Sequence, residues 1–410
     1  MERLFCWAVA TFLALACFTG QAFANHAYVA NTDDNTVTVI ETDDNTVIAT
    51  ISVGDSPQAM AITPSGRFVY VSNYNSNSIS VIDTTSLTVV DTFFAALNGP
   101  LGISFSNNGA YAYIANNGND TVSVIDTANN SLITTVTVGT APVSILTAPG
   151  GGFIYVANSF DNTISVMDIS TNLVVTTIAV GDFPFGLAIT PDGEFVYVTN
   201  LFSSNVSVID AASHTVTSTI PVGTTPRYIA ITPSAAYAYV ANSDSSDISV
   251  IDVNSNIVIA TIPVGNTPFG VAITPDGAYL YISIHNDNEV TVVDTSGNII
   301  IAINPVGSGP TFIVIMPSVL PPSSLSGKKL TNDLPFQKQF LNQLTWPAST
   351  SSGVVSYNIY RDGIPIGSVA ARGPLTYNDY AINKTKSYLY SVAAVNLNGL
   401  ESAQTTVIVN

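Results

Sequence analysis

The sequence predicts an all-β protein in which a seven-bladed β-propeller is followed by a small β-sandwich. Three observations lead to this fold. Three short motifs recur in phase every 42 or 43 residues, each repeat reads as four short strands, and the repeat stops near residue 320. A repeat unit of this length with four strands has the size of one propeller blade. The predicted segments are a signal peptide at 1–24, the propeller at 25–318 and the sandwich at 319–410.

The first 24 residues have the pattern of a Sec signal peptide. Arg3 precedes a mainly apolar run from Leu4 to Phe18, and Ala22-Phe23-Ala24 forms a cleavage site of small residues. An uncleaved anchor and a lipoprotein attached through Cys17 are the alternatives. No later apolar run approaches the roughly 18 residues of a membrane helix. We therefore expect export to the periplasm, the cell surface or the medium.

The repeat is defined by a Tyr-Val-Ala-Asn-like string, a Val-Ile-Asp string and a Val-Gly-x-x-Pro string in constant register. Such self-similarity is typical of repeat architectures. The Asn position holds Asn31, Asn73, Asn116, Asn158, Asn200, Asn242 and finally Ile284. The Asp position holds Glu41, Asp83, Asp126, Asp168, Asp210, Asp252 and Asp294. The Pro position holds Pro57, Pro142, Pro184, Pro226, Pro268 and Pro310, and the second unit departs with Asn98-Gly99-Pro100.

The fifth unit illustrates the strand pattern. Its predicted strands are Phe185–Thr190, Phe195–Thr199, Val206–Ile209 and Thr215–Val222, separated by turn residues. Consecutive apolar residues within the strands fit a sheet that is buried on both faces, as a blade between two neighbours is.

The order of the strands also predicts how the ring closes. The mature chain enters on a second strand at Tyr28, and the missing first strand appears at the far end as Thr311–Met316. Pairing of these two segments would complete the seventh four-stranded blade and leave no open end in the ring.

These motifs resemble the YVTN family of seven-bladed β-propellers, which occur in bacterial and archaeal surface and secreted proteins. The resemblance covers residues 25–318, because all three motifs recur in phase along this segment. It implies the propeller fold and an extracytoplasmic setting. It implies no single activity, since related propellers include surface-layer proteins, subunits of redox enzymes and lactonases.

The segment after Pro321-Pro322-Ser323-Ser324 reads as alternating strands and hairpins. It looks like a fibronectin type III domain, with Trp346 and the pair Tyr388 and Tyr390 as core aromatics. The sequence Arg361-Asp362-Gly363 is predicted to form a turn.

Charge and composition exclude several classes of function. Residues 25–320 carry 23 acidic residues but only two bases, Arg67 and Arg227, so a nucleic acid or an anionic membrane surface is a poor partner. Both cysteines lie in the signal peptide, and the three histidines are scattered. A cysteine or histidine metal site and a serine-histidine-acid triad are therefore not expected.

The recurring Asp and the acidic loops are two further candidate sites. The recurring Asp is expected to cap the turn that follows it, and the recurring Asn is expected to have a structural role as well. No cofactor is expected; calcium binding at acidic loops is the alternative to solvated loops. These loops contain Asp33-Asp34-Asn35, Asp43-Asp44-Asn45, Asp244, Asp247 and Asp287-Asn288-Glu289.

The most informative candidate site is the residue after each recurring Pro, because these residues should surround one mouth of the central channel. Gln58, Leu101, Val143, Phe185, Arg227, Phe269 and Thr311 occupy this position. A guanidinium between aromatic rings suits an anionic or aromatic ligand group. The candidate ligand- or partner-binding residues are Phe160, Phe183, Phe185, Phe202, Arg227, Phe269 and His285. The alternative is that the phenylalanines only fill the turns between blades and Arg227 only neutralises nearby acids.

The preferred functional prediction is an exported binding scaffold that is not an enzyme and presents its loop face to a protein or cell-surface partner. The first alternative is a lactonase-like hydrolase or a redox-enzyme subunit that uses the channel mouth. The second is a surface-layer structural protein.

Overall fold

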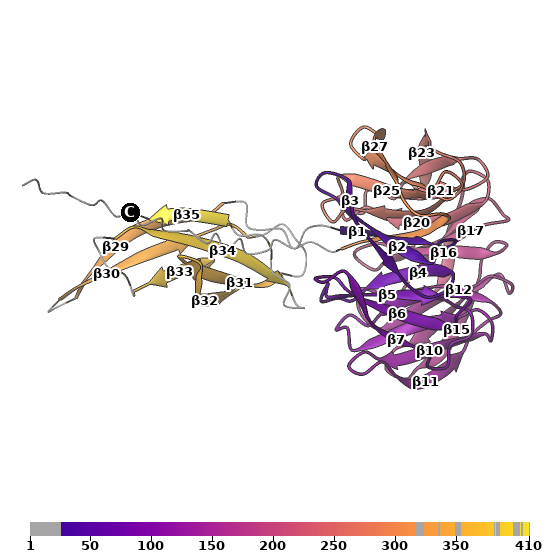
Figure 1. The fold of residues 1–410 in the computed structure, drawn as a ribbon, viewed down its shortest axis with the longest axis horizontal. Coiled ribbons are helices and arrows are strands. Elements are labelled where there is room, and N and C mark those ends of the chain that lie inside the picture. The colour runs from indigo at the N-terminus through magenta and orange to yellow at the C-terminus, as the bar shows by residue number, and fades with distance from the viewer. Residues whose placement is uncertain are drawn as a thin grey trace, which may run out of the picture. The chain divides into compact units, whose positions relative to one another are not determined.

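The computed structural model describes residues 26–316, 324–334, 337–348, 354–380, 382, 386–396, 402 and 405–409. These residues form two compact units, one ending at residue 316 and one beginning at residue 324 (Figure 1). All regular structure in these ranges is β-strand, and no helix there could span a membrane. The predicted signal peptide with Cys17 and the predicted boundary at Pro321-Pro322-Ser323 lie outside the described residues.

The first unit contains seven four-stranded antiparallel sheets, counted over residues 26–316. Blade 1 comprises β28 (Pro310–Ile315), β1 (His26–Asn31), β2 (Thr36–Glu41) and β3 (Thr46–Ser52). Blade 2 comprises β4 (Pro57–Ile62), β5 (Phe68–Asn73), β6 (Ser78–Asp83) and β7 (Thr88–Phe93). Blade 3 comprises β8 (Pro100–Phe105), β9 (Tyr111–Asn116), β10 (Thr121–Asp126) and β11 (Ser131–Thr137). Blade 4 comprises β12 (Pro142–Thr147), β13 (Phe153–Asn158), β14 (Thr163–Asp168) and β15 (Leu173–Ala179).

The remaining three blades follow the same order. Blade 5 comprises β16 (Pro184–Ile189), β17 (Phe195–Asn200), β18 (Asn205–Asp210) and β19 (Thr215–Pro221). Blade 6 comprises β20 (Pro226–Ile231), β21 (Tyr237–Asn242), β22 (Asp247–Asp252) and β23 (Ile257–Pro263). Blade 7 comprises β24 (Pro268–Ile273), β25 (Tyr279–Ile284), β26 (Glu289–Asp294) and β27 (Ile299–Pro305). The predicted strands of the fifth unit begin and end within one residue of the observed ones.

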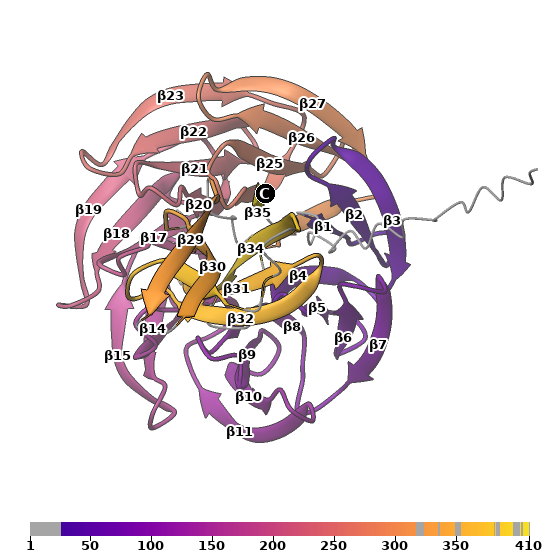
Figure 2. The same cartoon turned by 90° about the vertical axis from the view of Figure 1, so that its left-hand side faces the viewer.

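The fourth strands form the rim of the ring, and the first strands lie innermost, where each contacts the first strand of the next blade (Figure 2). The two middle strands of each blade are buried on both faces, which explains their consecutive apolar residues. The fourth strands carry threonine and exposed aliphatic side chains, because at the rim they make few contacts with the neighbouring blades.

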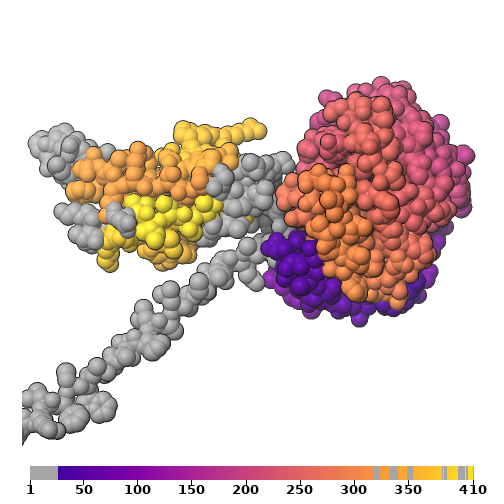
Figure 3. Space-filling view, turned by 90° about the horizontal axis from the view of Figure 1, so that it is seen from above, coloured from indigo at the N-terminus to yellow at the C-terminus, as the bar shows by residue number. Residues whose placement is uncertain are grey.

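The two ends of the repeat meet in blade 1. Strand β28 pairs antiparallel with β1, so that Ala27 lies opposite Ile315 and Val29 lies opposite Ile313. The backbone N–H of Met316 also donates to the carbonyl of His26 at 2.9 Å. Figure 3 shows the indigo N-terminal blade directly beside the orange seventh blade.

The recurring Asn couples two of the three motifs. In blade 6 the buried amide nitrogen of Asn242 donates to Ser249 at 2.9 Å, which ties the end of β21 to β22. A Cβ atom on Gly223 would lie 2.6 Å from the same amide, so the Val-Gly string must have glycine here. The same close approach joins Gly54 to Asn73, Gly139 to Asn158, Gly181 to Asn200 and Gly307 to Asn31. The structural role predicted for this Asn is confirmed.

Each Tyr of the first motif is buried, and most of these hydroxyls reach the neighbouring blade. The hydroxyl of Tyr197 donates to Asn256 at 2.6 Å, and that of Tyr239 donates to Asn298 at 3.3 Å. Both Asn residues lie in the turn between a third and a fourth strand with positive φ. Tyr281 of blade 7 donates to Asn45 of blade 1 in the same way, across the junction of the two chain ends.

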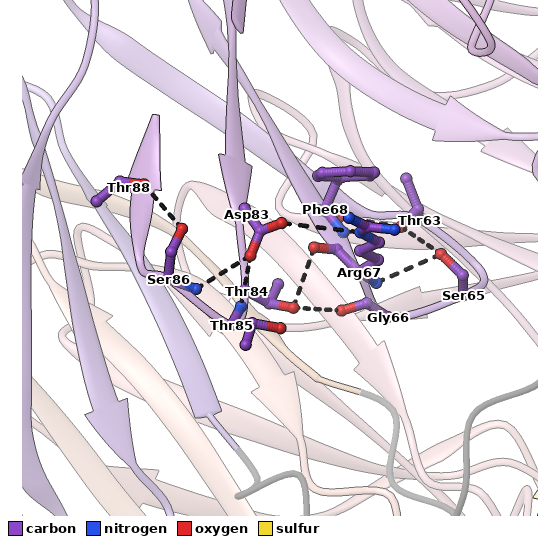
Figure 4. Close-up of polar contacts among 10 residues, drawn as sticks. All are labelled: Thr63, Ser65, Gly66, Arg67, Phe68, Asp83, Thr84, Thr85, Ser86 and Thr88. Carbon is purple, nitrogen blue, oxygen red and sulfur yellow. Dashed lines mark hydrogen bonds and ion pairs between the residues drawn. The ribbon is translucent and has the colours of Figure 1, made fainter. Parts of the chain in front are cut away.

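The recurring Asp caps the turn that follows it, as the sequence predicts. Asp83 accepts from the backbone N–H of Thr85 at 2.9 Å and of Ser86 at 3.0 Å (Figure 4). Arg67 lies 3.7 Å from the other oxygen of Asp83. Hydrogen bonds from Ser170 and Thr171 lower the pKa of Asp168, and equivalent bonds from Ser213 lower the pKa of Asp210.

The second unit contains two further sheets within its described residues. The strands are β29 (Ser326–Leu334), β30 (Gln337–Thr345), β31 (Val354–Arg361), β32 (Ile364–Ala370), β33 (Thr376–Asp379), β34 (Tyr388–Asn396) and β35 (Thr405–Val409). One sheet has the order β29-β30-β33 and the other β32-β31-β34-β35. Trp346 and Tyr390 are buried in one apolar cluster, and Tyr388 packs against its edge. Asp362 and Gly363 have positive φ and form the predicted two-residue turn between β31 and β32.

The turn-capping carboxylates predict acid sensitivity. The pKa values of Asp168, Asp252 and Asp294 lie below the ordinary 3.8, so the folded state holds fewer protons than the unfolded state as the pH falls. Their stabilisation is complete above the ordinary pKa and is lost below it. Urea unfolding should be measured between pH 6 and pH 3. The urea concentration at the midpoint of unfolding should decrease once the pH is below about 4. Asp252→Asn keeps the capping oxygen and should make this fall shallower; an unchanged slope would contradict the assignment.

The tyrosine contacts between blades predict a second result. Tyr281→Phe removes the hydrogen bond to Asn45 and should lower the free energy of unfolding by about 1.5 kcal/mol. Tyr28→Phe is the matched control, because the buried hydroxyl of Tyr28 has no hydrogen-bond partner among the described residues. Denaturant titration of both variants measures the difference, and equal losses would rule out a role for the Tyr281 bond.

Candidate functional site

The predicted mouth residues lie at the starts of the innermost strands. Each of these strands begins at a Pro, and the residue that precedes it has positive φ, for example Thr225 before Pro226. The loop after the second strand bonds this segment in place, since the N–H of Ser243 donates to the carbonyl of Thr225 at 3.0 Å. Arg227 is thereby held at the channel mouth by two loops of its own blade.

Arg227 lies between two aromatic rings from the blades on either side. Its guanidinium carbon is 4.3 Å from the ring centre of Phe269 and 5.3 Å from that of Phe185. Its Nε atom donates to the hydroxyl of Ser243 at 3.3 Å. No described carboxylate lies within 4.0 Å of the guanidinium. Burial lowers the pKa of Arg227 from its ordinary value, opposed by the charges of Tyr228 and Asp244.

Tyr228 spans the axis of the ring beneath Arg227. Its ring centre lies 5.2 Å from that of Phe185 in blade 5 and 4.7 Å from that of Phe312 in blade 1. Its hydroxyl also bonds Ser144 of blade 4, so one side chain contacts strands two blades away on both sides. Burial raises the pKa of this hydroxyl. Tyr228 and Phe312 therefore form an aromatic contact between the innermost strands of blades 6 and 1.

The other candidate residues lie in loops that follow the second strands or precede the first strands. The ring of His285 lies 5.9 Å from that of Phe269. The rings of Phe160, Phe183 and Phe202 form a separate row, with centres 5.7 and 4.9 Å apart. Phe160 and Phe202 are each 69% exposed. The structure thus groups Arg227, Phe185, Phe269 and His285 at the mouth, and the other three phenylalanines in a surface that we call the phenylalanine row.

The acidic loops considered for calcium each use a carboxylate oxygen within the fold. Asp287 accepts from the backbone N–H of Asn266 at 2.7 Å, and Asp247 accepts from Asn242 at 2.7 Å. Asp44 accepts from the N–H of Thr46 at 3.0 Å. In the described part of the chain, no three His, Cys, Asp or Glu side chains are grouped to hold a metal ion. That the protein has no cofactor stays a prediction, and calcium binding at these loops stays its alternative.

Tyr228 and Phe312 are not among the residues predicted from the sequence, although the repeat contains a signal for them. The second residue after the recurring Pro is Ala59, Gly102, Ser144, Gly186, Tyr228, Gly270 and Phe312. Small residues at five positions leave the axis open, and the two aromatic residues fill it. A Cβ on Gly186 would lie 2.5 Å from the carbonyl oxygen of Arg227, so the first strands approach too closely for a larger residue.

Two family models match the chain. The YNCE-like β-propeller model matches residues 64–151 and 140–315. The model of the lactonase with a seven-bladed β-propeller matches residues 21–92. No curated protein matches the sequence.

Several solved structures share the fold. A chain of Kuenenia stuttgartiensis hydrazine synthase is 25% identical, with a TM-score of 0.57 over 62% of this chain and 88% of that chain. A functionally unknown protein from Desulfotomaculum acetoxidans is 18% identical, with a TM-score of 0.64 over 71% of this chain and 99% of that chain. The dihydro-heme d1 dehydrogenase NirN in complex with DHE is 16% identical, with a TM-score of 0.58 over 72% of this chain and 76% of that chain. The last two likenesses show the fold alone.

These relationships contradict the prediction that the protein is not an enzyme. Residues 21–92 match the model of a lactonase with a seven-bladed β-propeller, and the chain of hydrazine synthase that is 25% identical belongs to an enzyme. The scarcity of histidine and cysteine argues only against chemistry by those side chains. A propeller can also serve a reaction through arginine, carboxylates or a neighbouring subunit.

The close contact of the innermost strands predicts that Gly186→Ala is destabilising. The new methyl group would collide with the carbonyl of Arg227, and the strands must shift, at a cost of about 1–3 kcal/mol. Gly150→Ala is the control, because no atom lies within 4 Å of a Cβ at that position. Urea unfolding of both variants decides the point, and equal stability would show that the axis can expand.

Proposed function

Because the chain belongs to the YNCE-like β-propeller family, we propose that it is the ligand-binding propeller of an enzymatic system and that Arg227 binds an anionic group at the channel mouth. A carboxylate or a phosphate of a small ligand has the chemistry that this site recognises.

The observation that carries this proposal is the position of the Arg227 guanidinium. Its faces are covered by Phe185 and Phe269, and Nε is directed to Ser243. No bond from its two terminal nitrogens to a described residue is present, and no described carboxylate lies within 4.0 Å, although the charge of Asp244 acts on it from farther away. A half-buried cation of this kind is costly without a counter-charge. An anion in the plane of the guanidinium would supply both the charge and the missing hydrogen-bond acceptors.

The aromatic surroundings favour a ligand with a planar or apolar body. Phe185, Tyr228, Phe269 and Phe312 form the floor and walls below the guanidinium. The phenylalanine row lies over blades 4 and 5 and offers a second apolar contact for a larger ligand or a partner protein. We also propose export through the Sec pathway and a fibronectin type III-like role as spacer for the C-terminal unit.

Hydrolysis of a lactone at the same mouth is the second candidate, supported by the lactonase match over residues 21–92. In that reaction water adds to the lactone carbonyl, the ring C–O bond breaks, and a hydroxy acid forms. Arg227 would bind the carbonyl oxygen as negative charge develops on it.

Arg227→Gln tests both candidates, and Arg67→Gln is the matched control. Arg67 is the other base of residues 25–320 and lies in the turn between β4 and β5, at the opposite strand ends. Calorimetry and thermal unfolding with phosphate, benzoate, citrate and lactones would measure binding; a ligand at 100 times its Kd should add about 2.7 kcal/mol to stability.

We expect binding of an anion by the native protein and by Arg67→Gln, and at least about tenfold weaker binding by Arg227→Gln. Release of hydroxy acid that Arg227→Gln abolishes would favour the lactonase candidate. Equal binding by all three proteins would refute the proposed mouth site.

A further inference from the structure

A groove of about 620 Å³ lies between blades 4 and 5, at the strand ends opposite the mouth. Three turns line it: the β12–β13 turn with Gly150 and Gly152, the β16–β17 turn with Asp192 and Glu194, and the β18–β19 turn that begins at Asp210. Phe153 and Phe195 form apolar parts of its walls. This groove shares no lining residue with the mouth.

The groove exists because blade 4 departs from the repeat. Gly150 stands where the equivalent turns have Ser65, Asn108, Asp192, Ser234 and Asp276. Gly152 stands where they have Arg67, Ala110, Glu194, Ala236 and Ala278. A Cβ on either glycine would meet no atom within 4 Å, so the missing side chains leave open space.

The side chain of Tyr155 is one of the lining residues of this groove, and it carries a buried hydroxyl without a partner among the described residues. Tyr155 is 0% exposed. In blades 5, 6 and 7 the equivalent tyrosine hydroxyl donates to an Asn of the next blade. His214 stands at this Asn position opposite Tyr155, and its ring centre lies 6.3 Å from that of Tyr155. The Nδ1 atom of His214 also lacks a described partner. Buried polar groups are rarely left unsatisfied, which points to a polar ligand or water at this position.

The charge of the groove defines the chemistry of its ligand. Asp192, Glu194 and Asp210 are the charged residues that line it. Asp192 accepts from the hydroxyl of Thr190 and Asp210 from that of Ser213, which keeps both carboxylates ionised at neutral pH. Three carboxylates beside two aromatic rings match an alkylammonium group, which combines a positive charge with apolar methylene groups.

We propose that the groove between blades 4 and 5 binds an organic ammonium group. Asp210 and Glu194 provide the negative charge, Phe153 and Phe195 contact the alkyl chain, and the Tyr155 hydroxyl provides a polar contact. A free diamine and a lysine side chain share this chemistry. The site is independent of Arg227 and of any ligand at the mouth.

Titration calorimetry with putrescine and with Nα-acetyl-lysine methyl ester tests the proposal. We expect at least one of them to bind the native protein, and binding to Asp210→Asn/Glu194→Gln to be about tenfold weaker or worse. Asp252→Asn removes the equivalent turn carboxylate of blade 6 and should bind as the native protein does. Binding of putrescine alone would identify a free amine as the ligand, and binding of both would identify a lysine side chain as well.

Gly152→Arg provides a second test, because it restores the residue that blade 2 has at this position. The new side chain would fill the groove and neutralise it, so amine binding should be lost while the thermal unfolding midpoint is retained. Arg227→Gln should leave amine binding unchanged, which separates this site from the mouth. Absence of amine binding by the native protein, or equal weakening by Asp252→Asn, would overturn the proposal.

Discussion

In five of the seven blades, a contact between the buried Asn of the second strand and a glycine of the loop between blades is the constraint on which the rest of the propeller depends. Asn242 ties β21 to β22 through Ser249, and its amide lies where Gly223 has no side chain. The loop that starts at Gly223 then delivers Pro226 and Arg227 to the mouth. A packing contact that does not itself bind a ligand therefore determines where Arg227 lies. Blade 7 has Ile284 at the Asn position, where its methyl group occupies the same space against Gly265.

Much of this architecture could be predicted from the sequence because each structural role is repeated. The backbone N–H three residues on donates to Asp83, Asp210 and Asp252 alike, so the six Asp copies of the motif share one physical cause. The pairing of β28 with β1 follows from the same regularity. The repeat begins with the second strand of blade 1, and the first strand of that blade comes after blade 7. Local turn chemistry and periodic burial are properties of short segments, and a sequence displays both directly.

The sites could be predicted only in part, because they depend on contacts between residues far apart in the chain. The grouping of Phe185, Arg227 and Phe269 follows from the repeat, since equal positions in adjacent blades must be neighbours. The closure of the axis does not follow from it, because Tyr228 contacts Ser144 and Phe312 from blades that are not adjacent to its own. Whether a central side chain points across the axis or into a blade depends on the size of all the residues opposite, which no single repeat encodes.

In a repeat protein of this kind, the positions that deviate from the repeat are the ones that indicate function. Residues that match the repeat are accounted for by packing, and so they carry little information about a ligand. Arg227 is a departure that adds a charge, while Gly150 and Gly152 are departures that remove side chains and expose three carboxylates. The two sites have opposite charge and lie at opposite ends of the strands, so one ligand cannot satisfy both. Under the two proposals above, the arginine mouth and the acidic groove would hold two different molecules at once, one anionic and one with an ammonium group.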